Sequence, residues 1–378
     1  MSGESLLFAP KFEKMALSKE AVLAALRNVQ DPDIKKDLVT LNMIQDIEID
    51  GNKLGFTVML TTPACPLKEL IRKDCEEAIA KYIGEDIEVT VTMSSHVTST
   101  RDNAPLLPGV KNIIAVASGK GGVGKSTVTA NLAVALAKQG AKVGVIDADI
   151  FGPSMPTMFN CEHEQPGIKK EGDKNLIIPV QQYGVKLISI GLLTPAENAV
   201  VWRGPMASSA LKQFIADTEW GELDYLFIDL PPGTSDIHLT LVQTVPVTGA
   251  VLVTTPQKVA IADAQKGLNM FQQAQINVPV LGVIENMAYF TPEELPESKY
   301  YIFGKGGGRK LAEKHNVPFI GEIPLVQGIR EGGDVGYPAI MNSDITGEAF
   351  KNVAEAVAQK IAIRNAEKAE TKKVEINV

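Results

Sequence analysis

The segment at residues 119–127 constrains the fold of this chain more than any other. It reads GKGGVGKST, and it lies between an apolar run at residues 113–117 and an alanine- and leucine-rich stretch at residues 128–137. Glycines let a backbone curl tightly, so that several N–H groups and a helix N-terminus can face one phosphate group. A strand, a glycine-rich turn and a helix in this order predict a phosphate-binding loop for a nucleotide triphosphate. The predicted contacts come from Gly119, Lys120, Gly121, Gly122, Val123, Gly124, Lys125, Ser126 and Thr127.

Three polar side chains of this loop have predicted roles. Lys125 is expected to reach the β- and γ-phosphates of the nucleotide, while the hydroxyl of Ser126 binds Mg²⁺. The basic loop pattern does not require Lys120. We expect Lys120 to reach a phosphate held by a second subunit, as an arginine finger does, and a solvated surface lysine is the alternative.

Acidic residues follow two other apolar runs of the chain. Asp147 and Asp149 come after residues 143–146, and Asp229 comes after residues 223–228. Ligands of open α/β sheets bind at the carboxyl ends of the strands, so these acids are candidates for a Mg²⁺ site beside the loop. An aspartate that caps a turn or a helix is the alternative for each of them.

The spacing of apolar residues and turn signals predicts two domains. Residues 1–100 are expected to form a small α/β domain of α-β-β-α-β order, because an Asp-Gly-Asn turn at residues 50–52 separates two alternating runs. A linker is predicted at residues 101–110, where proline, glycine and polar residues concentrate. The elements of the small domain are predicted at residues 20–29 (helix), 45–49 and 53–61 (strands), 67–82 (helix) and 87–93 (strand).

Residues 111–365 are expected to form the second domain, and residues 366–378 a charged, flexible tail. In the second domain, apolar runs alternate with helical stretches, which predicts the α/β class: a P-loop NTPase fold with a mostly parallel sheet and helices on both faces. Further strands are predicted at residues 142–146, 185–190, 223–228, 250–253 and 280–284.

The composition excludes some classes of partner. The formal net charge is −8, and acidic residues exceed basic ones both up to residue 110 (17 against 12) and after it (28 against 25). The chain therefore has no basic footprint for nucleic acid. No apolar run approaches the roughly 18 residues of a membrane span, and the N-terminus does not follow a secretory plan, so a cytoplasmic location without a membrane partner is expected. Three scattered cysteines fit a reducing compartment.

Several motifs together resemble the Mrp/ApbC family of iron–sulfur cluster carriers, within the deviant Walker A group that also includes MinD, ParA and the nitrogenase iron protein. The N-terminal part resembles the small domain fused to many of these proteins, with the signature TTPACP at residues 61–66. The similarity thus covers nearly the whole chain. The other motifs are the loop itself, DADIFGPS (147–154), WRGPM (202–206), DLPPGTSD (229–236), NM (286–287) and IFG (302–304).

The resemblance implies roles for the candidate residues. In this group the extra lysine, here Lys120, implies a homodimer that encloses the nucleotides between its subunits. Asp229 would hold Mg²⁺, Asp147 would contact the Mg²⁺ shell, and Asp149 would orient the attacking water. By the same resemblance Asn286 contacts the adenine, although a buried structural asparagine is the alternative.

One part of the family pattern differs in this chain. The family normally carries Cys-Pro-x-Cys between the Asn-Met and Ile-Phe-Gly motifs, and two such pairs in a dimer would bind a bridging cluster. Here the span reads TPEE, with Thr291 and Glu294 at the cysteine positions. Cys65 is the remaining candidate ligand, because Pro66 is expected to begin a helix whose N-terminus stabilises a thiolate; a buried or structural turn residue is the alternative. Cys75 is expected in the core.

These observations predict a slow MgATP hydrolase that binds and transfers iron–sulfur clusters. Its cofactors would be ATP and Mg²⁺, and whether a cluster binds without the Cys-Pro-x-Cys pair is left open. Its partners would be a second copy of the chain, apo iron–sulfur proteins and cluster-assembly proteins. The main alternative is an ATP-switched dimeric scaffold or positioning ATPase without a cluster, and a metabolic kinase or synthetase is a third class.

Overall fold

The computed structural model of the chain describes residues 16–101, 106–172, 174–194, 202–292, 294–369 and 371–374. These residues separate into two compact units. The smaller unit reaches His96, and the larger one begins at Val97 and also includes Thr62–Ala64. Each unit has a hydrophobic core of its own. Parts of the predicted tail, residue 370 and residues 375–378, lie outside the described residues.

The smaller unit is a three-stranded sheet with two helices. Strands β1 and β2 pair antiparallel, and β2 and β3 pair parallel, in the order β1-β2-β3. Ser18 accepts a hydrogen bond from the N–H of Ala21 and so caps the first helix. The α-β-β-α-β order predicted from the sequence is the order observed. The elements are α1 (Lys19–Leu26), β1 (Ile44–Asp50), β2 (Lys53–Leu60), α2 (Lys68–Tyr82) and β3 (Glu88–Ser95).

The larger unit contains an eight-stranded sheet in the order β13-β12-β11-β4-β10-β5-β9-β8. Neighbouring strands are parallel from β13 to β9, and β8 is antiparallel to β9. The predicted fold class, a mostly parallel α/β sheet, is confirmed. The strands are β4 (Val110–Ser118), β5 (Val143–Asp147), β8 (Val180–Gln182), β9 (Val185–Ser189), β10 (Leu223–Asp229), β11 (Gly249–Thr254), β12 (Val280–Glu285) and β13 (Phe319–Glu322).

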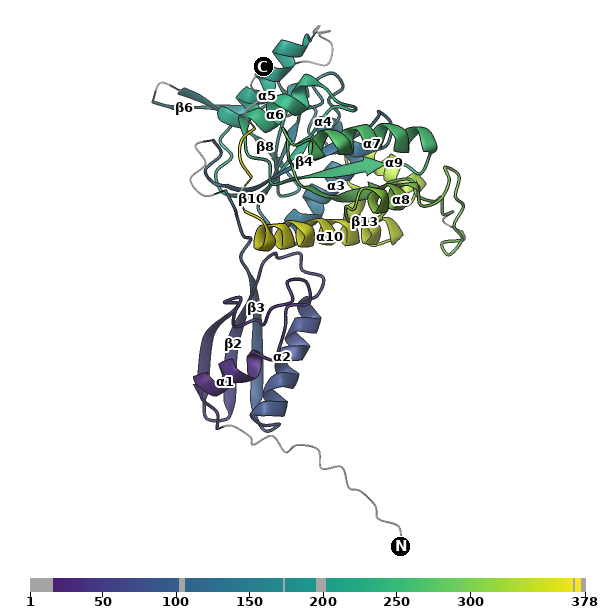
Figure 1. Cartoon of the computed structure of the whole chain (residues 1–378). Coiled ribbons are helices and arrows are strands. Elements are labelled where there is room, and N and C mark those ends of the chain that lie inside the picture. The colour runs from purple at the N-terminus through teal and green to yellow at the C-terminus, as the bar shows by residue number, and fades with distance from the viewer. Residues whose placement is uncertain are drawn as a thin grey trace. The chain divides into compact units, whose positions relative to one another are not determined.

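Helices cover both faces of this sheet (Figure 1). One buried cluster joins the sheet to α3 and α10, and a second cluster on the other side joins it to α5, α6, α7 and α8. Strands buried on both faces carry continuous apolar runs, as β4 does at residues 113–117. The longer helices are α3 (Lys125–Lys138), α5 (Gly204–Ala216), α6 (Asp236–Thr244), α7 (Lys258–Gln272), α8 (Gly307–Lys314), α9 (Gln327–Asp334) and α10 (Ile345–Glu367).

Two features of the larger unit differ from the sequence expectation. A two-stranded antiparallel hairpin, β6 (Gly167–Glu171) with β7 (Lys174–Ile178), stands apart from the main sheet. It was missed because its first strand is exposed along its whole length and has no alternating apolar pattern. In the predicted linker, Arg101 is buried and donates to the carbonyls of Leu106 and Val110, so these three residues are held together within the larger unit.

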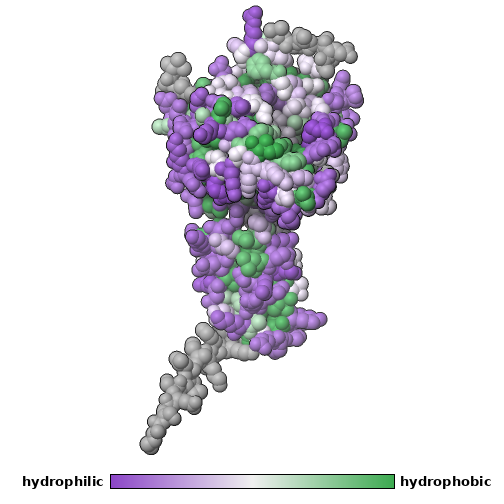
Figure 2. Space-filling model, turned by 90° about the vertical axis from the view of Figure 1, so that its right-hand side faces the viewer, coloured by the Kyte–Doolittle hydropathy of each residue, from purple (hydrophilic) through white to green (hydrophobic). Residues whose placement is uncertain are grey.

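None of the helices in the described ranges is long and apolar enough to cross a membrane. On the face of the molecule that Figure 2 shows, hydrophilic residues predominate, and apolar residues lie in small groups between them.

The core beneath α10 gives a direct test of the fold. Phe350 is fully buried in the cluster that joins α10 to α3. We expect Phe350→Ala to lower the free energy of unfolding of the larger unit by about 3–5 kcal/mol, because a large cavity replaces the ring. Both tryptophans, Trp202 and Trp220, belong to this unit, so their fluorescence can follow its unfolding in denaturant. The exposed neighbour Lys351 is the control, and an equal loss in Lys351→Ala would contradict the packing described.

Candidate functional site

The glycine-rich loop runs from the end of β4 into α3, and the surrounding structure requires glycine at several of its positions. Gly122 and Gly124 have φ angles of 80° and 78°, which side chains rarely adopt. A Cβ at Gly119 would lie 2.1 Å from the backbone nitrogen of Ala264, and one at Gly124 would lie 2.3 Å from Nδ2 of Asn286. A larger residue therefore has no room at Gly119 or Gly124, and at Gly122 the backbone angle disfavours one.

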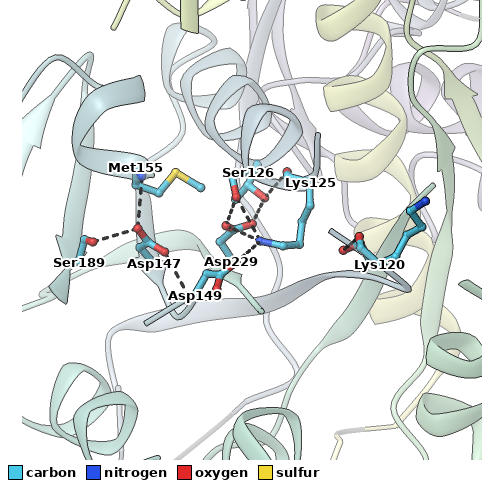
Figure 3. Close-up of polar contacts among 10 residues, drawn as sticks. Lys120, Lys125, Ser126, Asp147, Asp149, Met155, Ser189 and Asp229 are labelled. Carbon is cyan, nitrogen blue, oxygen red and sulfur yellow. Dashed lines mark hydrogen bonds and ion pairs between the residues drawn. The ribbon is translucent and has the colours of Figure 1, made fainter. Parts of the chain in front are cut away.

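The parallel register brings the predicted acids next to this loop. Asp147 and Asp229 end the neighbouring strands β5 and β10, where they are register partners. The Nζ of Lys125 lies 2.7 Å from Oδ2 of Asp229, and the hydroxyl of Ser126 donates to the same oxygen at 2.6 Å. Asp149 lies just beyond β5, with Oδ2 3.8 Å from Nζ of Lys125. Figure 3 shows this cluster, in which Lys125 points towards the acids.

Two further hydroxyl groups complete the site, and the sequence reasoning missed both. Thr129 donates to Oδ1 of Asp229 at 2.7 Å, and Ser189 donates to Oδ2 of Asp147 at 2.9 Å. A signal for each exists in the sequence. Thr129 lies four residues after Lys125, hence on the same helix face, and Ser189 ends a strand in the manner of Asp147.

The acids differ in their electrostatic environment. Asp147 is completely buried and also accepts from the N–H of Met155 at 3.3 Å. Burial raises the pKa of Asp147 to about 7, and the nearby charge of Asp229 adds to the increase. Burial likewise raises the pKa of Asp149, although the charge of Lys125 opposes the shift. The cluster thus holds more carboxyl groups than cations.

A cavity of about 190 Å³ lies over the loop, and Asp149 and Pro232 contribute to its wall. Lys120 also lines it, but its side chain points away from Lys125 and the acids (Figure 3). Lys120 is half-buried and therefore accessible to a further molecule. This orientation is compatible with contact in trans and with a solvated lysine, so its role stays a prediction.

Asn286 lies at the end of β12, where it supports the loop. Its side-chain amide donates to the carbonyl of Val123 at 2.8 Å, and the residue is 6% exposed. The alternative of a buried structural asparagine is thus supported by a specific hydrogen bond, to the carbonyl of Val123. Contact with the adenine stays a prediction.

The cysteines occupy different environments. Cys65 is half-buried. The expectation that Pro66 begins the helix is wrong: α2 begins at Lys68, because Leu67 adopts a non-helical conformation with ψ of 8°. Cys75 and Cys161 are buried, and burial raises the pKa of each thiol to about 12. Neither of the buried thiols is therefore available as a thiolate near neutral pH.

Thr291 and Glu294 stand at the positions where the resemblance implies cysteines. Thr291 is 3% exposed, and its hydroxyl has no hydrogen-bond partner among the described residues. Across all residues that the structure describes, no group of three or more histidine, cysteine, aspartate or glutamate residues is arranged to hold a metal ion.

His238 is buried at the start of α6, close to the phosphate site. Its Nδ1 accepts from the N–H of Ser235 at 3.3 Å and so caps the helix. Burial lowers the pKa of His238 to about 4, and the positive charge of Lys125 adds to the decrease. The imidazole is therefore neutral at physiological pH and serves a structural role.

The fold and the site define a P-loop NTPase. Comparison with known proteins narrows this class: the ParA family, described as NUBPL iron-transfer P-loop NTPases, matches residues 109–362, and a family of iron–sulfur cluster assembly proteins matches residues 19–91. This chain belongs to the iron-transfer P-loop NTPase family and has an assembly-type domain before it. The resemblance inferred from the motifs is confirmed.

Individual relatives match over nearly their whole length. An iron–sulfur cluster carrier protein of Synechocystis sp. is 47% identical over 350 residues, which cover 92% of this chain and 99% of the relative. A protein of the same name from Deinococcus radiodurans is 46% identical over 91% of this chain and 96% of the relative. The solved structure of a nucleotide-binding protein from Archaeoglobus fulgidus, in complex with ADP, is 42% identical with a TM-score of 0.53, over 61% of this chain and 88% of that one.

The buried His238 predicts a specific pH dependence. An unfolded histidine binds a proton below its ordinary pKa of 6.5, whereas the folded one stays neutral down to about pH 4. The stability that the neutral imidazole contributes is therefore present above pH 6.5 and is lost as the pH falls. We expect this residue to account for a loss of about 2 kcal/mol between pH 7 and pH 5.

Denaturant unfolding followed by tryptophan fluorescence at both pH values measures this loss. His238→Asn is the matched variant, because its Oδ1 can replace Nδ1 as the acceptor for Ser235 and it does not titrate. Its unfolding free energy should fall by about 2 kcal/mol less than that of the wild type between pH 7 and pH 5. An identical pH dependence in the two proteins would show that His238 is not buried in the neutral form.

Proposed function

We propose that this protein is a homodimeric MgATPase that binds iron–sulfur clusters and transfers them to apoproteins. The observation that carries the proposal is the match, over 92% of this chain and 99% of the relative, to a protein named as an iron–sulfur cluster carrier. The assembled loop and acid cluster support the ATPase part. Its partners would be a second copy of the chain, cluster-assembly proteins and apo iron–sulfur proteins.

The residues around the loop suit MgATP. Backbone N–H groups of the loop and the N-terminus of α3 would bind the phosphates. The ammonium group of Lys125, which is now paired with Asp229, would also contact the phosphates. Oxygen ligands are what Mg²⁺ prefers, and Ser126, Asp147 and Asp229 would hold it. When bound, the ion neutralises charge that develops on the phosphates.

Hydrolysis requires a positioned water and further positive charge. Asp149 is half-buried and lines the cavity beside the loop, so its carboxylate would accept a hydrogen bond from the attacking water and orient it. Lys120, which points away from Lys125 in its own subunit, would supply its ammonium to the nucleotide of the partner subunit.

Variants of the two lysines test this arrangement. Lys125→Ala should abolish nucleotide binding, whereas Lys120→Ala should still bind ATP but hydrolyse it roughly a thousandfold more slowly, as expected for a residue that acts in trans. Equilibrium nucleotide binding and steady-state phosphate release measure the two effects.

A mixture of the two variants is the sharper experiment. In a mixed dimer, the Lys120→Ala subunit holds the ATP and the Lys125→Ala subunit supplies an intact Lys120. Phosphate release should therefore recover when the two inactive proteins are combined. Mixtures that stay as inactive as the separate variants would contradict the assignment of Lys120 to the partner's nucleotide.

The iron–sulfur cluster would be cargo, and this chain has few cysteine thiolates with which to hold it. Soft thiolates are the usual ligands of iron–sulfur clusters, and threonine and glutamate at positions 291 and 294 do not replace them. Because Cys75 and Cys161 are buried with raised pKa values, Cys65 is the thiol proposed to hold the cluster.

Anaerobic reconstitution with iron and sulfide tests the role of Cys65. The wild type should acquire charge-transfer absorption and should activate an apo iron–sulfur acceptor, and Cys65→Ser should lose both. Cys161→Ser is the matched control, since the serine can keep the hydrogen bond to the Pro156 carbonyl. Wild-type protein that stays colourless and activates no acceptor would overturn the carrier function while leaving the ATPase proposal intact.

One observation favours a second function, an ATP-switched scaffold without a cluster. The segment with Thr291 and Glu294 has lost the thiolates of the family pattern while the loop and its acids are intact. This alternative predicts partner proteins that bind only with a nonhydrolysable ATP analogue and contain no iron. Affinity capture with and without the analogue, with iron measured in the captured complex, separates it from the carrier function.

A further inference from the structure

A second cavity lies at the amino ends of strands of the main sheet, whereas the phosphate loop lies at the carboxyl ends. It has a volume of about 510 Å³, and its wall includes Val280 and Pro318, at or just before the first residues of β12 and β13, together with the last turns of α10. The phosphate loop, in contrast, follows the last residue of β4. Since these strands are parallel, the two cavities lie at opposite ends of the strands of one sheet.

Three cationic residues of α10 and its end contribute to the wall of this cavity. Lys360, Arg364 and Lys368 are spaced four residues apart, which places them along one face of a helix and its end. The wall includes one acid, the exposed Glu367. Within the described residues, no carboxylate forms an ion pair with any of the three cations. The wall therefore carries surplus positive charge.

Arg364 shows that this charge is partly removed from water. The residue is 5% exposed, and its guanidinium donates to Oγ1 of Thr100, Oδ1 of Asn365 and the carbonyl of Ala369, all of them neutral acceptors. Its Nε is buried and has no hydrogen-bond partner among the described residues. A buried cation without an opposite charge is costly, and a bound anion would reduce that cost.

We propose that this cavity is a binding site for a small organic anion that carries two or more carboxylate or phosphate groups. Its volume lies within the usual range of roughly 300–1,000 Å³ for small-molecule sites. Lys360 and Lys368 would pair with the anionic groups, and the field of Arg364 would strengthen both contacts. Leu281 and Ile363 in the wall would contact the carbon skeleton.

Citrate and fructose 1,6-bisphosphate serve as probes, the first for an organic carboxylate ligand and the second for an organic phosphate ligand. Calorimetric titrations would use the full chain carrying Lys125→Ala, so that the phosphate loop contributes little. We expect saturable binding of at least one probe, weakened about tenfold or more by Lys360→Gln with Lys368→Gln. These substitutions leave Arg364 and its hydrogen bonds in place.

A second pair of substitutions separates a local site from general electrostatics. Lys351 and Lys372 are exposed and lie outside the cavity wall, so Lys351→Gln with Lys372→Gln removes the same charge. This control pair should change the affinity by less than about twofold. Failure of both probes to bind, binding that ignores the Lys360 and Lys368 substitutions, or equal weakening by the control pair would each overturn the proposal.

Discussion

The buried ion pair between Lys125 and Asp229 is the interaction on which the rest of the site depends. The side chain of Lys125 is 5% exposed and that of Asp229 is fully buried, at a separation of 2.7 Å. Removing two charges from water costs several kcal/mol per ion, and the pair is tolerable only when its remaining hydrogen-bonding groups are satisfied. Ser126 and Thr129 satisfy the carboxylate. The start of α3 and the end of β10 are thus held in one arrangement.

This pair also explains the electrostatics around it. One ammonium faces three carboxyl groups, and the most deeply buried of the three, Asp147, has a pKa raised to about 7. The surplus of acidic groups at the carboxyl ends of the parallel strands attracts cations, which is the physical basis of the Mg²⁺ proposal. The amino ends of strands β12 and β13, beside α10, instead carry a surplus of positive charge. The two ends of the strands of one sheet therefore differ in charge.

The sequence predicted the parts of this molecule that depend on local pattern. Glycine spacing and apolar runs are patterns within a few neighbouring residues. They are enough to predict where the loop lies, where the strands on either side of it run, and where the acids at the strand ends stand. Thr129, Ser189 and the bond from Asn286 to Val123 were missed because they depend on which strands and helices become neighbours. The start of α2 was misplaced because proline favours a first helical turn without requiring one, and in this chain the turn from Cys65 to Leu67 comes first.

The segment that follows β12, which includes Asn286 and Thr291, is hydrogen-bonded to the phosphate loop. Asn286 binds the loop through Val123, and Ala288 and Phe290, further along the same segment, donate to the carbonyls of Ile323 and Tyr300. Thr291 follows at once and is 3% exposed. The side chain of Thr291 therefore lies in the interior of the larger unit. Because position 291 is buried and carries no thiol, the proposal for the cluster rests on Cys65.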